Sequence, residues 1–420
     1  MRRILSTVVL CMLVSISFAQ KKAVKEAKNA MNSDKFSEAR TLIKPALTNP
    51  ETESDPETWK VAGDIENKAF DKEKTNEMMR KTVNEEVMFT SLYNSYDPYV
   101  KADQLGELPD DKGKIKNKYR KDIAAIMKAN HAYFANGGLY YNDKKQFAKA
   151  ADYFEKYWDM PSLPMFEDEK SKIEVVDSTF QIIKYYAVLC ANYAGDHDRA
   201  INYLHRIMKE PFAENSLYQE SHVYELLASE YNQKGDSVKF MQTLEDGAKK
   251  YPKSNYFVTN LVNVYIKRKE ADKAVAYLDQ AIANDPTNAC EFYGVKASIY
   301  GENNEFDNSV ASYNQALSAD GNCERALEGL AVLYILKAQD TKEIASKAAT
   351  RKEQSDLDLQ VKDLYNKAIP LLQKYKTLLE ARKAENSDIK AALYKLRNVY
   401  YNLNMNDEYD ATEKEYNAID

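Results

Sequence analysis

Glycine and proline are scarce in this chain of 420 residues, with 12 and 11 copies respectively. All-β domains need many turns built from these two residues, so their scarcity argues against that class and favours long helices joined by short turns. The chain is longer than one compact core usually serves, which predicts two or more domains or a repeat array. A content of 30% charged and 44% apolar residues is typical of a folded chain rather than a disordered one.

Motifs of common enzymes and cofactor-binding folds are also missing. The sequence contains no G-x-G-x-x-G, no G-x-S-x-G, no H-E-x-x-H and no cysteine pair with zinc spacing. The stretch GELPDDKGK (106–114) is not a phosphate-binding loop, because six residues instead of four separate its glycines. We therefore expect no enzymatic activity, no metal and no cofactor. Catalytic carboxylates stay open, although no pair stands out among the 65 Asp and Glu residues. An enzyme with its site in 71–128 or 159–178 is the alternative.

A strong basic character is absent as well. The formal net charge is −6, and Lys and Glu are interspersed along the chain. This charge pattern does not predict a nucleic-acid partner. Beyond the first residues, no segment approaches the ~20 apolar residues of a membrane span.

The first residues, MRRILSTVVLCMLVSISFAQ, have the pattern of a secretory signal peptide. Arg2 and Arg3 precede a mostly apolar run, Ile4–Ile16, and the small residues Ser17 and Ala19 stand where signal peptidase requires them. We predict cleavage after Ala19 and export of the protein, with no membrane anchor afterwards. An uncleaved anchor is the alternative, but the apolar run is short for a bilayer span.

The sequence repeats itself with a period of about 35 residues. AVAYLDQAIANDPTNA (274–289) is followed 35 residues later by SVASYNQALSADGNC (309–323), and four tyrosines are 34, 35 and 34 residues apart: Tyr231, Tyr265, Tyr300 and Tyr334. In both stretches apolar or small residues recur at i, i+3, i+4, i+7 and i+8, which is one face of an α-helix. Each tyrosine is expected near a helix end, before a short polar turn. Small residues hold the same two places in both copies, which lets two helices approach closely.

This pattern resembles the tetratricopeptide repeat, a helix–turn–helix unit of about 34 residues. The clearest copies are 255–288 and 290–323, 221–254 is a third, and looser copies lie in 137–158, 185–208 and 34–47. The resemblance implies an all-α fold, a right-handed superhelical solenoid of such repeats. As a whole, the chain looks like an exported bacterial protein of this family.

The repeat pattern divides the chain into segments. We expect a signal peptide over 1–19, an N-terminal helical block over 20–158 with an irregular insertion at 71–128, a connecting loop and candidate hinge at 159–178, a core array over 179–336, and an elongated helical hairpin with a capping repeat over 337–420. Pro370 is expected to kink its helix.

Three cysteines remain after the predicted cleavage: Cys190, Cys290 and Cys323. An odd number does not define a disulfide framework. Cys290 and Cys323 are one repeat apart, and neighbouring helix axes in a stacked array lie about 8–10 Å apart, beyond the usual Cα reach of a disulfide. We expect small buried thiols, with a bridge as the open alternative.

In such a solenoid the first helix of each repeat lines a concave binding groove. Projecting the repeat onto the sequence gives these candidate groove residues: Asn142, Tyr185, Asn192, His222, Glu225, Ser229, Asn232, Tyr256, Thr259, Asn263, Lys267, Glu291 and Ser298. The three asparagines 142, 192 and 232 occupy equivalent places, and such a row of amides can hold an extended peptide backbone. Alternatively, they stand near helix C-termini because Asn tolerates the left-handed conformation. The tyrosines likewise either contact ligands or, at helical core spacing, fill the core.

The resemblance and the missing motifs together favour a non-enzymatic scaffold that binds a protein or peptide on its concave face. We expect it in the periplasm or on the outer-envelope surface of a Gram-negative bacterium. The alternative is a glycan-binding component of an outer-membrane nutrient-uptake system. Against the alternative stand the low tryptophan count of 2 and the lack of a cysteine placed for a lipid anchor.

Overall fold

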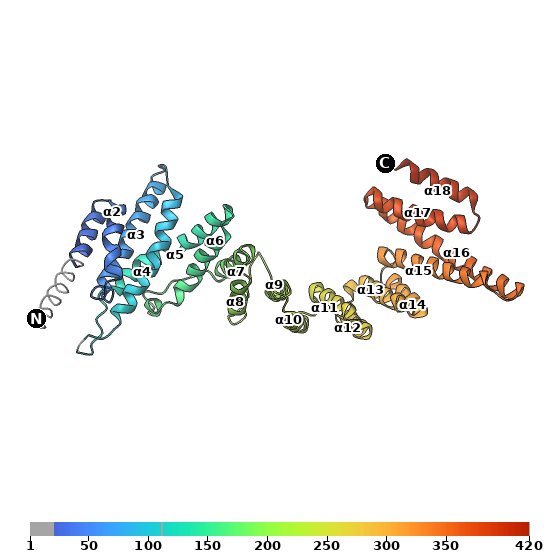
Figure 1. Cartoon of the computed structure of the whole chain (residues 1–420), viewed down its shortest axis with the longest axis horizontal. Coiled ribbons are helices and arrows are strands. Elements are labelled where there is room, and N and C mark those ends of the chain that lie inside the picture. Colours follow the sequence, from blue (N-terminus) through green and yellow to red (C-terminus); the bar gives the residue numbers. More distant parts are fainter. Residues whose placement is uncertain (1–20, 111, 420) are drawn as a thin grey trace, which may run out of the picture. The chain divides into compact units, whose positions relative to one another are not determined.

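Helices account for all regular structure in the computed structural model, which describes residues 21–110 and 112–419 (Figure 1). The chain divides into two compact units, Met1–Gly235 and Asp236–Asp420. The predicted all-α class, built of helix–turn–helix repeats, is confirmed. The predicted signal peptide lies outside the described residues. Among the helices within them, none combines the length and the apolar character needed to cross a bilayer.

The first unit consists of successive helical hairpins. Its helices are residues 21–32, α2 (Phe36–Ile43), α3 (Pro56–Met78), α4 (Glu85–Gly106), α5 (Arg120–Asp143), α6 (Phe147–Asp159), α7 (Asp177–Tyr193), α8 (His197–Ile207) and α9 (Glu220–Gln233), with the short 3₁₀ helices η1 (Lys44–Leu47), η2 (Met160–Ser162) and η3 (Pro164–Phe166).

The second unit continues with the same kind of element. Its helices are α10 (Ser237–Lys250), α11 (Asn255–Lys267), α12 (Ala271–Asn284), the 3₁₀ helix η4 (Pro286–Asn288), α13 (Ala289–Glu302), α14 (Phe306–Ala319), α15 (Glu324–Ser346), α16 (Arg351–Ala381), α17 (Asn386–Asn402) and α18 (Asn406–Ala418).

One turn geometry recurs between the two helices of a repeat. A residue in the left-handed conformation stands two positions before the second helix begins, with φ between 57° and 75°: Asp34, Lys145, Gly195, Gly235, Lys269, Asn304 and Asn404. The next N–H then reaches back five residues: Glu270 N–H donates to the Tyr265 carbonyl and Glu305 N–H to the Tyr300 carbonyl, both at 2.9 Å. This is the hydrogen bond of a Schellman motif, which ends a helix and reverses the chain. The predicted place of Tyr265 and Tyr300, just before a turn, is therefore confirmed.

Tyr334 differs from the other members of this series. It lies in the middle of α15, which continues to Ser346, so no turn follows it. Helix α15 has 23 residues and packs along α16, which has 31. Helix α16 contains Pro370 in its interior and does not end there.

Small residues pack where the repeat predicts them. Ala274, Ala281, Ser309 and Ala316 are all buried, and Ser309 Oγ donates to the Ala297 carbonyl at 2.7 Å across the hairpin. The bare backbone that they leave admits the neighbouring helix closely. The prediction that these positions allow close helix approach is confirmed.

Segment 71–128, which fits the repeat least, is also helical for most of its length. Helices α3 and α4 form a long hairpin, and the loop that follows α4 is tied down at Asp103, whose side chain is buried. Arg120 forms two hydrogen bonds with the Asp103 carboxylate, at 2.8 and 2.9 Å, and the Asn117 amide donates to the Asp103 carbonyl at 3.0 Å. The segment therefore extends the helical array with longer helices.

Residues 159–178 form a packed connection rather than a structureless loop. The 3₁₀ helices η2 and η3 lie here, and Met160, Phe166 and Ile173 are buried. Because these apolar side chains are withdrawn from water, the segment is fixed to the first unit. The division between the units comes later, after Gly235, inside the segment 179–336 that the sequence presents as one array.

The structure corrects the expectation that Cys290 and Cys323 are separate thiols. Their sulfur atoms are bonded to each other, and their Cα atoms lie 6.0 Å apart. The expectation was wrong because it used the distance between helix axes. Cys290 is the second residue of α13 and Cys323 immediately precedes α15, so both side chains project into the space between two neighbouring helix ends. Cys190 is a buried free thiol.

Candidate functional site

Two hollows in the second unit adjoin each other, because Arg325 lines both of them. The first, of about 260 Å³, lies between α11 and α13 and is lined by Asn255, Val258, Thr259, Val262, Asn263, Leu278, Asn288, Glu291, Phe292, Val295 and Arg325. The second, of about 660 Å³, lies between α13 and α15 and is lined by Ala297, Ser298, Gly301, Glu302, Ser309, Tyr313, Glu324, Arg325, Glu328, Gly329, Val332, Leu333, Leu336 and Tyr375. We call the two hollows together the groove. Most of its lining comes from α11, α13 and α15, the first helices of successive repeats, and α12, α14 and α16 add a few residues.

Arg325 joins the two hollows, since it lines both. Its Nε lies 2.7 Å from Glu291 Oε2, and both side chains are about half exposed. The stem of Arg325 runs over Gly294, where any Cβ would collide with it. The glycine therefore leaves room for the Arg325 stem between α13 and α15.

The second hollow is lined by both apolar and charged side chains. Val332, Leu333 and Leu336 supply the apolar surface, and Leu336 is 53% exposed. Glu324 pairs with Arg382 at 2.9 Å and Glu328 pairs with Lys395 at 3.0 Å. A lining of apolar and charged side chains suits a segment that presents both apolar and polar side chains.

Two tyrosines complete this hollow. Tyr313 Oη lies 3.1 Å from Ser298 Oγ, which also donates to the Gly294 carbonyl at 3.1 Å. Burial, together with the Glu328 carboxylate, raises the pKa of Tyr375 to about 12. Tyr375 therefore remains a neutral hydroxyl at physiological pH, able to donate a hydrogen bond.

Four of the predicted groove residues meet here. Thr259, Asn263 and Glu291 line the first hollow, and Ser298 lines the second. Tyr256 and Lys267 lie on α11 outside these linings, Tyr256 half-buried against Phe257 and Lys267 exposed at the helix end.

The other candidates belong to the first unit, where several are occupied by internal contacts. The Tyr185 ring stacks on Tyr218 with centroids 3.9 Å apart. His222 Nδ1 accepts a hydrogen bond from the Gln219 N–H at 3.2 Å, which closes the start of α9. The remaining placements are: Glu225 and Ser229 half-buried on α9, Asn142 half-buried on α5, Asn192 half-buried on α7 and Asn232 exposed on α9.

The three equivalent asparagines do not form a uniform row. Asn192 donates its amide to Glu230, Asn142 Oδ1 lies 3.6 Å from the Cys190 thiol, and Asn232 is exposed. Each is the last but one residue of its helix, and the left-handed position comes three residues later. The proposed reason for Asn at these places, tolerance of the left-handed conformation, is therefore wrong.

A buried carboxylate in the first unit has no counterpart among the predicted site residues. The Glu230 side chain is fully buried on α9 and accepts hydrogen bonds from Asn192 and from His197 Nδ1, the latter at 2.7 Å. It therefore joins α9 to the end of α7 and the start of α8. Its signal in the sequence is a Glu in the apolar stripe that includes Val223 and Leu227.

The family model of the tetratricopeptide repeat matches residues 257–288 and 291–323. The chain contains tetratricopeptide repeats. The two matched repeats contribute α11 and α13 to the groove, and α15 follows as the first helix of the next repeat. Such repeats typically form scaffolds for protein–protein interaction, and proteins built from them are generally not enzymes.

The chain also matches solved structures, two of which are described as TPR proteins. The C-terminal part of a TPR repeat-containing protein from Cytophaga hutchinsonii is 15% identical, with 67% of this chain and 94% of that chain covered and a TM-score of 0.42. A TPR repeats protein from Bacteroides fragilis is 14% identical, with coverages of 64% and 97% and a TM-score of 0.32. PilW, a widely conserved type IV pilus biogenesis factor, is 15% identical, with coverages of 57% and 92% and a TM-score of 0.35. The comparison with curated proteins finds no match.

The tetratricopeptide register explains which groove residues sequence reasoning missed. Arg325 stands 34 residues after Glu291, and Leu333 stands 35 residues after Ser298. Advancing the predicted positions by one more repeat would therefore have reached α15.

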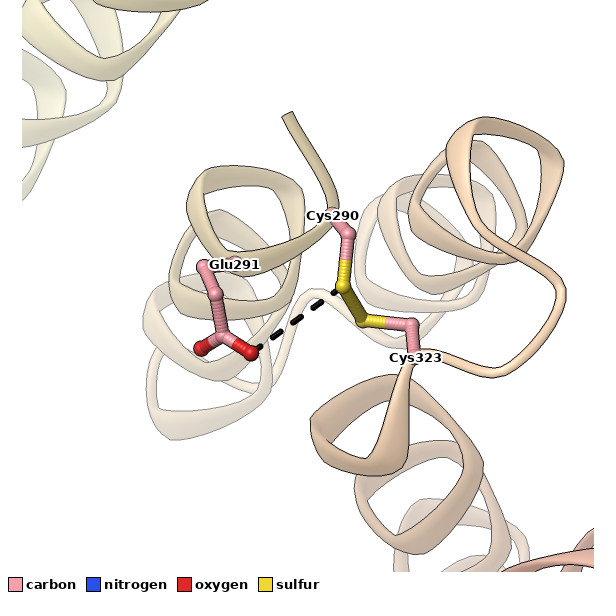
Figure 2. A group of neighbouring side chains, drawn as sticks. All are labelled: Cys290, Glu291 and Cys323. Carbon is pink, nitrogen blue, oxygen red and sulfur yellow. Dashed lines mark hydrogen bonds between the residues drawn. A yellow bond between two sulfur atoms is a disulfide. The ribbon is translucent and has the colours of Figure 1, made fainter. Parts of the chain in front are cut away.

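The groove end also carries a possible metal-ligand cluster. Ligand atoms of Cys290, Glu291 and Cys323 lie within 4.8 Å of one another (Figure 2). Metal ions bind cysteine as thiolate, whereas these two sulfurs are bonded to each other. In this state the cluster offers one carboxylate, and it is better described as a cross-link beside the groove.

Proposed function

We propose that the protein is a non-enzymatic scaffold of the bacterial envelope that binds a protein or peptide segment in the groove of its second unit. The observation that carries this proposal is that the two hollows adjoin along α11, α13 and α15, with Arg325 lining both. A ligand that follows the groove meets new side chains at each repeat. An extended polypeptide has that form, with regularly spaced side chains and backbone polar groups.

The chemistry of the lining fits a polypeptide ligand. Asn263 and Thr259 can exchange hydrogen bonds with backbone amides, and Arg325 can bind a carboxylate or a carbonyl. The apolar surface of Val332 and Leu336 offers a place for one apolar side chain. Together these features supply both orientation and affinity, which a binding site needs.

Two observations support a location outside the cytoplasm. The first residues have the pattern of a signal peptide. In addition, the Cys290–Cys323 disulfide belongs to a class of bond that persists mainly in oxidising compartments such as the periplasm. Export to the periplasm or to the outer-envelope surface is therefore part of the proposal.

A peptide selection tests the groove directly. Random linear peptides displayed on phage are selected on the full chain, and the affinities of enriched peptides are measured for wild type and for a double variant, Asn263→Ala with Arg325→Gln. We expect the double variant to lose about tenfold in affinity or more, since a hydrogen bond to a charged group contributes about 1.5–3 kcal/mol.

Arg351→Gln serves as the matched control, because Arg351 is exposed at the start of α16, outside both hollows. It should bind the selected peptides as wild type does. The proposal fails if no peptide is enriched, or if the groove variant and the control bind equally well. A glycan array run in parallel tests the alternative of a glycan-binding protein, which the groove favours less because Tyr375 is its main accessible aromatic ring.

A further inference from the structure

The Cys290–Cys323 disulfide connects the two helices that form the walls of the second hollow. Cys290 is the second residue of α13, and Cys323 directly precedes α15. Helix α14 and its turns lie between them in the sequence, so the bond closes a loop with a sequence separation of 33 residues. The disulfide therefore fixes the distance between two successive first helices at their N-terminal ends.

The residues beside the two cysteines are groove residues. Glu291 follows Cys290, Arg325 lies two positions after Cys323, and these two side chains form the 2.7 Å ion pair. Figure 2 shows the Glu291 carboxylate directed toward the disulfide, with Oε1 4.0 Å from Cys290 Sγ. Any separation of the two helix ends would therefore also separate Glu291 from Arg325 and change both hollows.

The ion pair alone is a weak link between the helix ends. Both of its side chains are about half exposed, and exposed ion pairs contribute little because water and salt screen them. The disulfide is the strong link between the helix ends, and a reductant can break it. Cys290 is only partly buried, so a reductant can reach its sulfur, whereas Cys323 is buried.

We propose that the Cys290–Cys323 disulfide is a redox-controlled latch: oxidised, it holds the groove in its binding form, and reduction by a protein dithiol opens the groove and weakens ligand binding. The inference rests on the proposed function for its binding consequence. Its structural consequence, the loosening of α13 and α15, is independent of any ligand.

The exchange reaction is balanced in two steps. A thiolate of the dithiol attacks Cys290 Sγ, the Cys290–Cys323 bond breaks, and Cys323 leaves as a thiolate that takes up a proton. The second thiol of the reductant loses its proton and attacks the reductant's first sulfur, which is bonded to Cys290 in the mixed disulfide. Cys290 is released as a thiolate and takes up a proton. The reductant ends as a disulfide, and two electrons have passed to the protein.

The first experiment needs no ligand. Hydrogen exchange of the full chain is measured by mass spectrometry before and after treatment with dithiothreitol, with α5–α8 of the first unit as the internal reference. We expect amides of 289–302 and 324–335 to exchange about 30-fold faster or more after reduction, a factor in the range that loss of a disulfide in a loop of this size implies. Unchanged exchange in these two helices would overturn the proposal.

A trapping experiment tests the direction of attack. A thioredoxin-type protein whose resolving cysteine is replaced by serine should form its mixed disulfide with Cys290. Peptide mapping that finds it on Cys323 would contradict the proposed step.

The second readout uses the peptides selected on the oxidised protein. Reduced wild type and the variant Cys290→Ser with Cys323→Ser should both bind them about tenfold more weakly, and dithiothreitol should not change the variant further. Equal affinity before and after reduction would refute the latch. If no peptide is enriched at all, the proposed function fails, while the exchange experiment still decides whether the disulfide controls the two helices.

Discussion

Removal of the Glu230 carboxylate should destabilise the first unit without affecting the second. The Glu230 side chain has 0% of its surface exposed and accepts hydrogen bonds from Asn192 and from His197, whose side chain is 31% exposed. Glu230→Ala deletes both hydrogen bonds and leaves a cavity between α9 and the α7–α8 turn. Hydrogen bonds to a charged acceptor contribute about 1.5–3 kcal/mol each. Water can replace part of the bond to His197. We therefore expect a loss of about 3 kcal/mol in the free energy of unfolding.

Tryptophan fluorescence makes this measurement selective. The chain contains 2 tryptophans, at 59 and 158, and both lie in the first unit. For a unit of this size, a loss of about 3 kcal/mol lowers the midpoint of thermal unfolding by roughly 6–12 °C. The fluorescence transition should move by this amount. A separate transition in circular dichroism, from the second unit, should stay in place.

Four further variants make the test decisive. Glu230→Gln keeps the shape and one acceptor, and should cost about 1 kcal/mol. Glu169→Ala, in an exposed loop, is the matched control and should stay within about 0.5 kcal/mol of wild type. In a double-mutant cycle, Glu230→Ala and Asn192→Ala should couple by about 0.5–3 kcal/mol. Additive effects of the pair, or a Glu230→Ala transition no lower than that of the control, would refute the account of Glu230 as the bridge.

Three more outcomes are expected, one each from packing, protonation and reactivity. Gly138→Ala should lower stability by about 1–3 kcal/mol in urea unfolding, because its Cβ would collide with the buried Phe154 ring. Gly321→Ala should change stability little, because the nearest atom to its Cβ would be Lys374 Nζ, at an ordinary contact distance of 3.6 Å. Equal effects of the two substitutions would contradict the packing argument. Burial lowers the pKa of His131 below its usual 6.5. The folding free energy should therefore be at its full value above pH 6.5 and fall as the pH drops toward the lowered pKa. The stability of His131→Gln in urea unfolding should depend less on pH, and an unchanged pH dependence would refute the assignment. Burial raises the pKa of Cys190 to about 12, so iodoacetamide at pH 8 should leave it unlabelled in the folded chain and label it after unfolding, as mass spectrometry can show.

Features that repeat along the chain could be predicted from sequence. The all-α class and the small residues at Ala274 and Ala281 follow from helical periodicity, and the structure confirms them. The groove residues Thr259, Asn263, Glu291 and Ser298 could also be found, because their register is set by the same period. Positions that recur every 34 or 35 residues lie on the same face of successive first helices, so one repeat predicts the next.

Features that depend on how particular side chains meet could not be predicted in this way. Whether Cys290 and Cys323 bond depends on how two helix ends face each other, and helix-axis spacing does not describe that. The burial of Glu230 depends on two partners that lie 33 and 38 residues away along the chain. The division after Gly235 could not be predicted, because the repeat pattern of the sequence continues across it. In each case the deciding quantity is a local geometry in three dimensions.

The left-handed turn inside each repeat has a consequence for how such proteins diverge. It is built from a backbone hydrogen bond and one residue with positive φ, and here glycine, lysine, asparagine and aspartate all fill that position. A structural rule met by so many side chains constrains sequence weakly. Neighbouring repeats can therefore drift apart in sequence while each still ends its first helix in the same way. A family model compares amino-acid types and not backbone conformation. This accounts for a match to two repeats, although the same turn geometry recurs from Asp34 to Asn404.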